Sequence, residues 1–135
     1  MNSDRKTSYS PMDGAIDRHI LQTLQEDAAD NDPEIILELL DIYIHDSADH
    51  LNQIIQAVPE EEYRTIELSA HSLKSSSATF GATNLAVLFG EMEQLARSKT
   101  TDGIDGLLNA AKSEFVRARD ELLVERRRWV EAASK

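Results

Sequence analysis

A regular apolar repeat is the feature that most constrains the fold of this chain. Between residues 104 and 130, apolar side chains return every three or four positions and, at the end, after seven, at Ile104, Leu108, Ala111, Phe115, Ala118, Leu122 and Trp129. This spacing places them on one side of an α-helix, which turns once in about 3.6 residues. No segment of strand length alternates β-branched and polar residues. The chain is therefore expected to be all-α.

Start and stop signals divide the remaining sequence into four further helices. Asp32 followed by Pro33 is typical of a helix start, because aspartate caps the first turn and proline fits the first helical position. Pro59, followed by three glutamates, predicts the start of the next long helix, and Gly81 predicts its end. The expected helices cover residues 17–27, 33–58, 59–80, 83–98 and 104–130.

Four long helices joined by short connections can bury their apolar sides against one another. The sequence predicts an antiparallel, up-down-up-down four-helix bundle, with the short first helix lying over one end. Coiled-coil oligomerisation would use the same periodicity, but a chain that folds back this often can bury its apolar positions within a monomer. This domain is expected to span residues 13–135. Residues 1–12 are polar and include a proline, so a disordered tail is expected there.

The third expected helix carries the candidate chemistry, in the sequence His71-Ser72-Leu73-Lys74-Ser75. The apolar side of this helix contains Ile66, Ala70, Leu73, Ser77 and Phe80. His71 points well away from that side, together with Lys74 and Ser75, and is expected to face water. A neutral imidazole has a nitrogen lone pair that can accept a phosphoryl group, and a nearby ammonium can stabilise the phosphoryl charge. The alternative is a surface histidine with no function.

The stretch from His71 to Ala82 resembles the phosphoacceptor motif of histidine-containing phosphotransfer (HPt) domains. In that motif a helical histidine is followed three positions later by lysine, and later by Gly-Ala, here Gly81-Ala82. The resemblance covers residues 15 to 130. It implies that His71 is phosphorylated and that Lys74 supports the phosphoryl group. It also implies that the partners are receiver domains of response regulators or hybrid sensor kinases.

The chain departs from the family pattern at two positions. Ser75 stands where the family most often has glycine, and this small residue lies next to the proposed acceptor site. A serine there is expected to tighten the approach of a partner or to add a hydroxyl hydrogen bond. Glu93 stands where some members carry a glutamine that orients the histidine, so the sequence leaves the role of this residue open.

The function that follows is a phosphorelay intermediate. His71 is expected to accept a phosphoryl group from a receiver aspartate and to pass it to another receiver. The five glycines form no phosphate-binding loop, so the chain is expected to be a phosphoryl carrier with no ATP site, no cofactor and no kinase activity of its own. The alternative is a helical adaptor that binds a signalling protein without being phosphorylated, with His71 incidental.

Charge and hydropathy narrow the list of partners. Residues 13–93 contain 17 acids and only three bases, which argues against nucleic acid as a partner. The basic run Arg126-Arg127-Arg128 is interpreted as a solvated helix end. No apolar run approaches the roughly 18 residues of a membrane span, and no signal peptide is evident. A cytoplasmic protein without membrane insertion is therefore expected.

Two further groups of residues have alternative interpretations. His45 with Asp49, and Asp46 with His50, have the i,i+4 spacing of a metal chelate on a helix, but a solvated polar face explains them more simply. No metal site is expected. In the short first helix, Ile20, Leu21 and Leu24 are either bundle core or part of a docking patch for a receiver domain.

Overall fold

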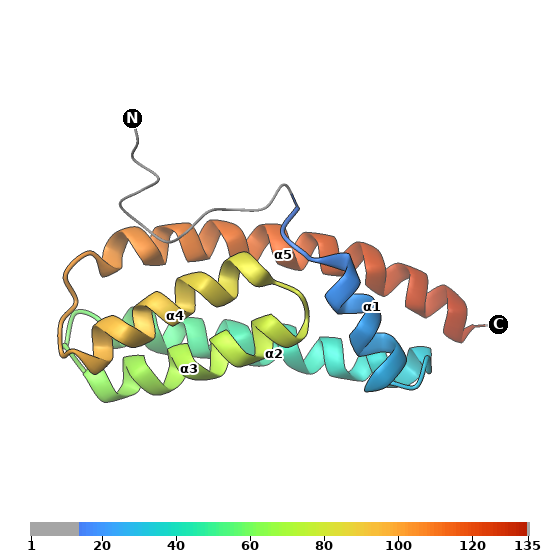
Figure 1. Ribbon diagram of the computed structural model, residues 1–135, viewed down its shortest axis with the longest axis horizontal. Coiled ribbons are helices and arrows are strands. Elements are labelled where there is room, and N and C mark those ends of the chain that lie inside the picture. The colour runs from blue at the N-terminus through green and yellow to red at the C-terminus, as the bar shows by residue number, and fades with distance from the viewer. Residues whose placement is uncertain (1–13, 135) are drawn as a thin grey trace.

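The structure is a computed structural model that describes residues 14–134 (Figure 1). It contains the helices α1 (Arg18–Asp27), α2 (Pro33–Ala57), α3 (Tyr63–Thr79), α4 (Thr83–Arg97) and α5 (Ile104–Ala133). Since no strand occurs within the described residues, the expected all-α class is confirmed. The tail expected at residues 1–12 lies outside the described residues.

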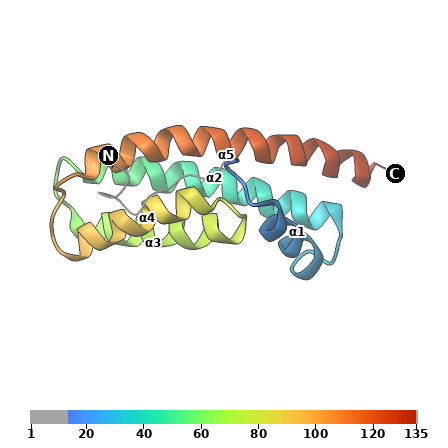
Figure 2. The ribbon, with the colours of Figure 1, turned by 45° about the horizontal axis from the view of Figure 1, so that its top comes forward.

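The two longest helices form the backbone of the molecule. Figures 1 and 2 show α2 and α5 running side by side, with the α3–α4 hairpin against one part of their length and α1 across the other part. Helix lengths explain this division, because α2 and α5 have 25 and 30 residues whereas α3 and α4 have 17 and 15. The short hairpin cannot cover the whole pair, and α1 covers the remainder. The predicted bundle with an additional helix over one end is confirmed.

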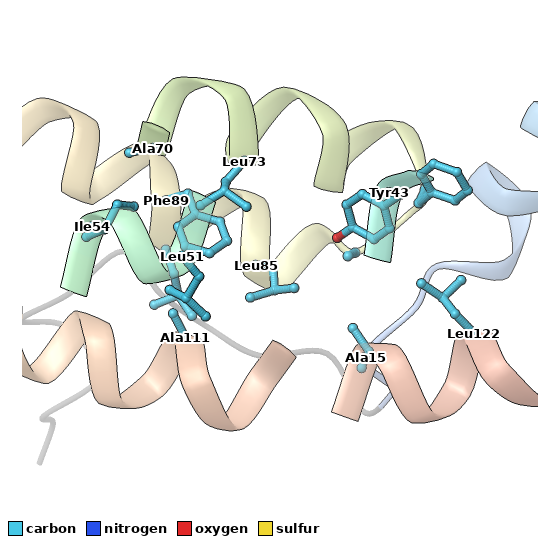
Figure 3. Packing of buried hydrophobic residues seen from close by; sticks show 14 of the residues in the cluster. Ala15, Tyr43, Leu51, Ile54, Ala70, Leu73, Leu85, Phe89, Ala111 and Leu122 are labelled. Carbon is cyan, nitrogen blue, oxygen red and sulfur yellow. The ribbon is translucent and has the colours of Figure 1, made fainter. Parts of the chain in front are cut away.

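The apolar positions predicted from periodicity form the core. In α5, the expected positions are buried except Phe115, which is partly buried and packs against the core. α4 also buries Phe89 completely, and Figure 3 shows this ring close to Leu73 of α3. Near the other end of the hairpin, Tyr43 stacks on Phe80 with ring centroids 4.7 Å apart, and a 2.9 Å hydrogen bond joins its hydroxyl to that of Ser77. The core therefore links α2 directly to the helix that carries His71.

The predicted start of the third helix was wrong. α3 begins at Tyr63, and Pro59 lies in the preceding turn. The N–H of Glu61 donates to the carbonyl of Val58 across this turn at 3.1 Å, which places proline at the second of four turn residues. The fixed φ of proline suits the second residue of a turn as well as it suits the first residue of a helix. A proline in the sequence is therefore compatible with either a turn or a helix start.

The last helix also differs from its prediction, because α5 continues through Ala133. The arginine triplet is therefore not at the helix end. Arg126 donates two hydrogen bonds to the Asp41 carboxylate of α2, at 2.9 and 3.0 Å, and Arg128 donates one to Glu125 at 3.3 Å. The run is solvated as interpreted, since the bonds of Arg126 are exposed, but it lies before the helix end and Arg126 ties α5 to α2.

The turn after α3 is fixed to the segment that precedes α1. Gly81 has a φ of +80°, a conformation that glycine adopts without strain, and its carbonyl accepts the N–H of Asp17 at 2.7 Å. On the other side, the Glu121 carboxylate of α5 accepts the N–H groups of Ala15 and Ile16 at 2.8 and 3.1 Å. These bonds fix α1 at the end of the α3–α4 hairpin.

Candidate functional site

α3 presents His71 on the outer side of the α3–α4 hairpin. Its neighbours Ala70 and Leu73 are buried in the core, whereas the His71 side chain is 59% exposed. This is the placement that the periodicity of α3 predicts, because the buried and exposed sides of a helix alternate with its 3.6-residue turn. The imidazole is therefore accessible to a partner while its backbone is fixed by the core.

A buried glutamate of α4 contacts the imidazole. His71 Nδ1 lies 2.9 Å from Glu93 Oε2, and the Glu93 side chain is 2% exposed. An ionised carboxylate can only accept hydrogen bonds, so Nδ1 carries the hydrogen of this pair. In the neutral ring the lone pair is then on Nε2.

Two cations complete the surroundings of the Glu93 carboxylate. Lys74 Nζ lies 2.7 Å from Oε1, and Arg97 Nη2 donates to Oε2 at 2.7 Å. Burial raises the pKa of Glu93, but the contacts with the Lys74 ammonium and with His71 outweigh it and hold this pKa below its ordinary value. Glu93 is therefore ionised at neutral pH.

Further charged groups extend the network along the hairpin. Arg97 Nε donates to Glu67 Oε2 at 3.2 Å, and Arg64 Nη1 lies 3.6 Å from Glu67 Oε1. Arg64, which shares the His71 side of α3 in the sequence, is therefore paired with Glu67. These contacts are partly or largely exposed, so each is expected to add little to stability.

The exposed surface next to His71 is lined by small and apolar side chains. Ser75 is exposed one turn after His71, and Leu68 is 50% exposed one turn before it. Of the residues considered for docking in α1, Leu21 is buried, whereas Ile20 and Leu24 are partly buried. The structure thus places Leu21 in the core and leaves parts of Ile20 and Leu24 accessible.

Two of the other histidines lie on different helices from this network. His19 is exposed on α1, and His45 is exposed on α2, where its Nδ1 lies 3.4 Å from Asp46 and 3.7 Å from Asp49. Across residues 14–134, no three histidine, cysteine or acidic side chains are placed so that they could hold a metal ion. In the same range, no helix has the length and apolar composition to cross a bilayer.

Sequence reasoning did not identify the partners of Glu93. His71 and Glu93 are 22 residues apart, and their contact depends on how α3 packs on α4. Arg97 was not singled out, although it lies one turn after Glu93 on the same helix, a spacing that pairs opposite charges. That spacing is the one local signal that could have identified it.

Comparisons with known proteins give one family match and one similar structure. The family model for the Hpt domain matches residues 38–124, which include His71, Lys74 and Glu93. The crystal structure of histidine-containing phosphotransfer protein B (HptB) from Pseudomonas aeruginosa PAO1 is similar, with a TM-score of 0.77 and 29% sequence identity. The similarity covers 87% of this chain and 98% of that chain. No match is found among curated protein sequences.

Proposed function

This chain belongs to the Hpt domain family, and from that membership we propose that it is a phosphorelay intermediate whose phosphorylated residue is His71. His71 accepts a phosphoryl group from an aspartate of one receiver domain and passes it to an aspartate of another. The observation that carries this proposal is the pairing of an exposed imidazole with a buried, ionised glutamate, because the pairing leaves Nε2 as the accessible nitrogen. Members of the family act as phosphocarriers in two-component signalling.

Phosphoryl transfer to His71 needs a nucleophilic nitrogen and a group that offsets the positive charge of the phosphorylated ring. Nε2 attacks phosphorus as the bond between phosphorus and the aspartate oxygen breaks, and the aspartate leaves as a carboxylate. The hydrogen stays on Nδ1, so the phosphorylated ring gains a positive charge. The Glu93 carboxylate, 2.9 Å from Nδ1, offsets that charge.

Lys74 has the second role in this proposal. Lys74 lies one turn from His71 and its side chain is 40% exposed, so its ammonium can approach the oxygens of a phosphoryl group on Nε2. The receiver domain supplies Mg²⁺ and its own acidic site. The chain itself needs to bind no nucleotide, and the proposal assigns it no kinase activity.

The receiver docks, in this proposal, on the exposed side of α3 around His71. Leu68 provides an apolar contact, and Ser75 and Ser72 are small enough to allow close approach. Ile20 and Leu24 of α1 remain candidates for the edge of this surface. The predicted monomeric state and cytoplasmic location stay predictions.

Labelling with a phosphorylated receiver domain tests the proposal. Acid-labile phosphate should appear on the wild-type chain and on His45→Gln, a matched control that changes an exposed histidine of α2. His71→Gln should fold normally and take no label, because glutamine has no nucleophilic ring nitrogen. An adaptor that is not phosphorylated would bind the receiver and acquire no label in any of the three proteins.

A further inference from the structure

A glycine in the middle of α4 faces the acceptor site. Gly90 lies three residues before Glu93, and a Cβ added to it would lie 3.3 Å from Lys74 Cδ. This separation is shorter than an ordinary van der Waals contact, so the aliphatic stem of Lys74 lies directly against α4 at Gly90. Glycine is less favourable than alanine inside a helix, so helix stability does not account for the presence of glycine at position 90.

We propose that Gly90 is a positioning residue of the acceptor site and that it acts through Lys74. Because position 90 has no side chain, the aliphatic stem of Lys74 can lie on the surface of α4. Its Nζ then lies 2.7 Å from Glu93 Oε1. The inference rests on the proposed function insofar as Lys74 stabilises the phosphoryl group. It adds a residue that touches neither His71 nor a receiver in the proposed reaction.

The physical basis is the flexibility of lysine. A lysine side chain has many rotamers, and holding its ammonium at one place costs conformational entropy. Contact of the stem with α4 restricts these rotamers before phosphoryl transfer begins, so less freedom is lost during transfer. A larger residue at position 90 would push the stem outward and separate Nζ from Glu93.

Gly106 provides a matched control. It is also a helical glycine, in the first turn of α5, and a Cβ added there would have no neighbour within 4 Å. Gly90→Leu and Gly106→Leu therefore make the same chemical change in a helix, but only the first meets Lys74. Gly90→Ala adds a single methyl group and displaces the stem less, which provides a second variant if leucine is not tolerated.

The position of Lys74 can be read from the titration of Glu93, measured by ¹³C NMR of labelled glutamate carboxyls. The contact between the Lys74 ammonium and the Glu93 carboxylate helps to lower the pKa of Glu93. Gly90→Leu should therefore raise this pKa in the same direction as Lys74→Ala, Gly90→Ala should raise it less, and Gly106→Leu should leave it unchanged. An unchanged Glu93 titration in both Gly90 variants would overturn the proposal.

Labelling by phosphoramidate, which requires no receiver, tests the consequence for the reaction. Gly90→Leu should slow labelling of His71 by no more than Lys74→Ala does, about tenfold or less. In the Lys74→Ala background it should have no further effect, and an additive loss would overturn the proposal. If the Glu93 titration changes in Gly90→Leu while the labelling rate does not, Gly90 positions Lys74 as proposed, but Lys74 does not stabilise the phosphoryl group.

Discussion

Glu93 is the residue on which the site depends, because its one carboxylate contacts His71, Lys74 and Arg97. A glutamine could accept the hydrogen of Nδ1 in the same way but would carry no charge. The carboxylate can therefore have two effects, of which an amide could have only the first. In the proposed function, it fixes the tautomer of the ring, and it offsets the positive charge that the ring gains on phosphorylation.

Two substitutions of Glu93 separate these effects. Glu93→Gln should keep the hydrogen on Nδ1 and slow labelling of His71 by about tenfold, the equivalent of roughly 1.4 kcal/mol of lost charge stabilisation. Glu93→Leu removes the acceptor, so both tautomers of His71 should be populated and labelling should fall further. Imidazole ¹⁵N NMR reports the tautomer directly. The role assigned to Glu93 is wrong if the leucine variant keeps both the wild-type tautomer and the wild-type rate.

The acid sensitivity of the fold provides a second test at this residue. In the folded protein the pKa of Glu93 is below its ordinary value of 4.5, so the unfolded chain binds the proton first as the pH falls. The stability that Glu93 contributes is present above about pH 4.5 and is lost as the pH falls through the folded pKa. The free energy of unfolding, measured by urea denaturation between pH 3 and pH 6, should fall more steeply in wild type than in Glu93→Gln. Equal slopes would contradict this assignment.

At the scale of elements, the turn between α3 and α4 fixes the hairpin to α1. Gly81 and Gly103 both have a positive φ, of +80° and +82°. A Cβ on Gly81 would lie 2.6 Å from the Asp17 carbonyl oxygen, whereas a Cβ on Gly103 would have no neighbour within 4 Å. Gly103 is therefore a control that has the same backbone conformation without the contact.

Gly81→Ala should destabilise the protein more than Gly103→Ala. The left-handed conformation alone costs a non-glycine residue about 1–2 kcal/mol, and this is the loss expected for Gly103→Ala. Gly81→Ala must also displace the backbone at Asp17, which should add roughly 1–3 kcal/mol. Thermal and chemical unfolding of the two variants measures the difference. Equal losses would mean that the contact between this turn and Asp17 does not hold α1 in place.

The helices themselves follow from local sequence signals, and the contacts between them do not. Asp32 caps α2 as predicted, and Asp17 caps α1 in the same way, because an aspartate before a helix satisfies backbone N–H groups within a few residues. Pro59 misled the prediction because a turn and a helix start both accept its φ. The contact of Gly90 with Lys74 depends on the packing of α3 on α4, which no local pattern of α4 reveals.

At the scale of the whole molecule, the proposed function assigns the reactive face to α3 and a structural role to α5. α3 carries His71 and packs mainly on α4 and α2, while α5 packs on α2 and α4. Leu68 on α3 and Val116 on α5 are exposed to a similar extent, 50% and 44%. In the proposed function, the receiver contacts the first of these residues and not the second.

Alanine substitutions at these two positions test the docking face. Leu68→Ala should weaken receiver binding severalfold without lowering the melting temperature, because an exposed apolar residue contributes to an interface and little to the fold. Val116→Ala should change neither property. Leu21→Ala, at a position only 4% exposed, should instead cost about 2–5 kcal/mol of stability. Calorimetric binding and thermal unfolding measure both properties, and equal receiver affinity for the two surface variants would place the docking face elsewhere.

The position of the phosphoryl group tests the central claim most directly. The wild-type chain, phosphorylated by a receiver domain and uniformly labelled with ¹⁵N, can be examined by ¹⁵N and ³¹P NMR for the nitrogen that is bonded to phosphorus. We expect phosphorus on Nε2 of His71, since Nδ1 is held by Glu93 at 2.9 Å. Phosphorus on Nδ1 of His71, or on any other residue, would contradict the proposed mechanism.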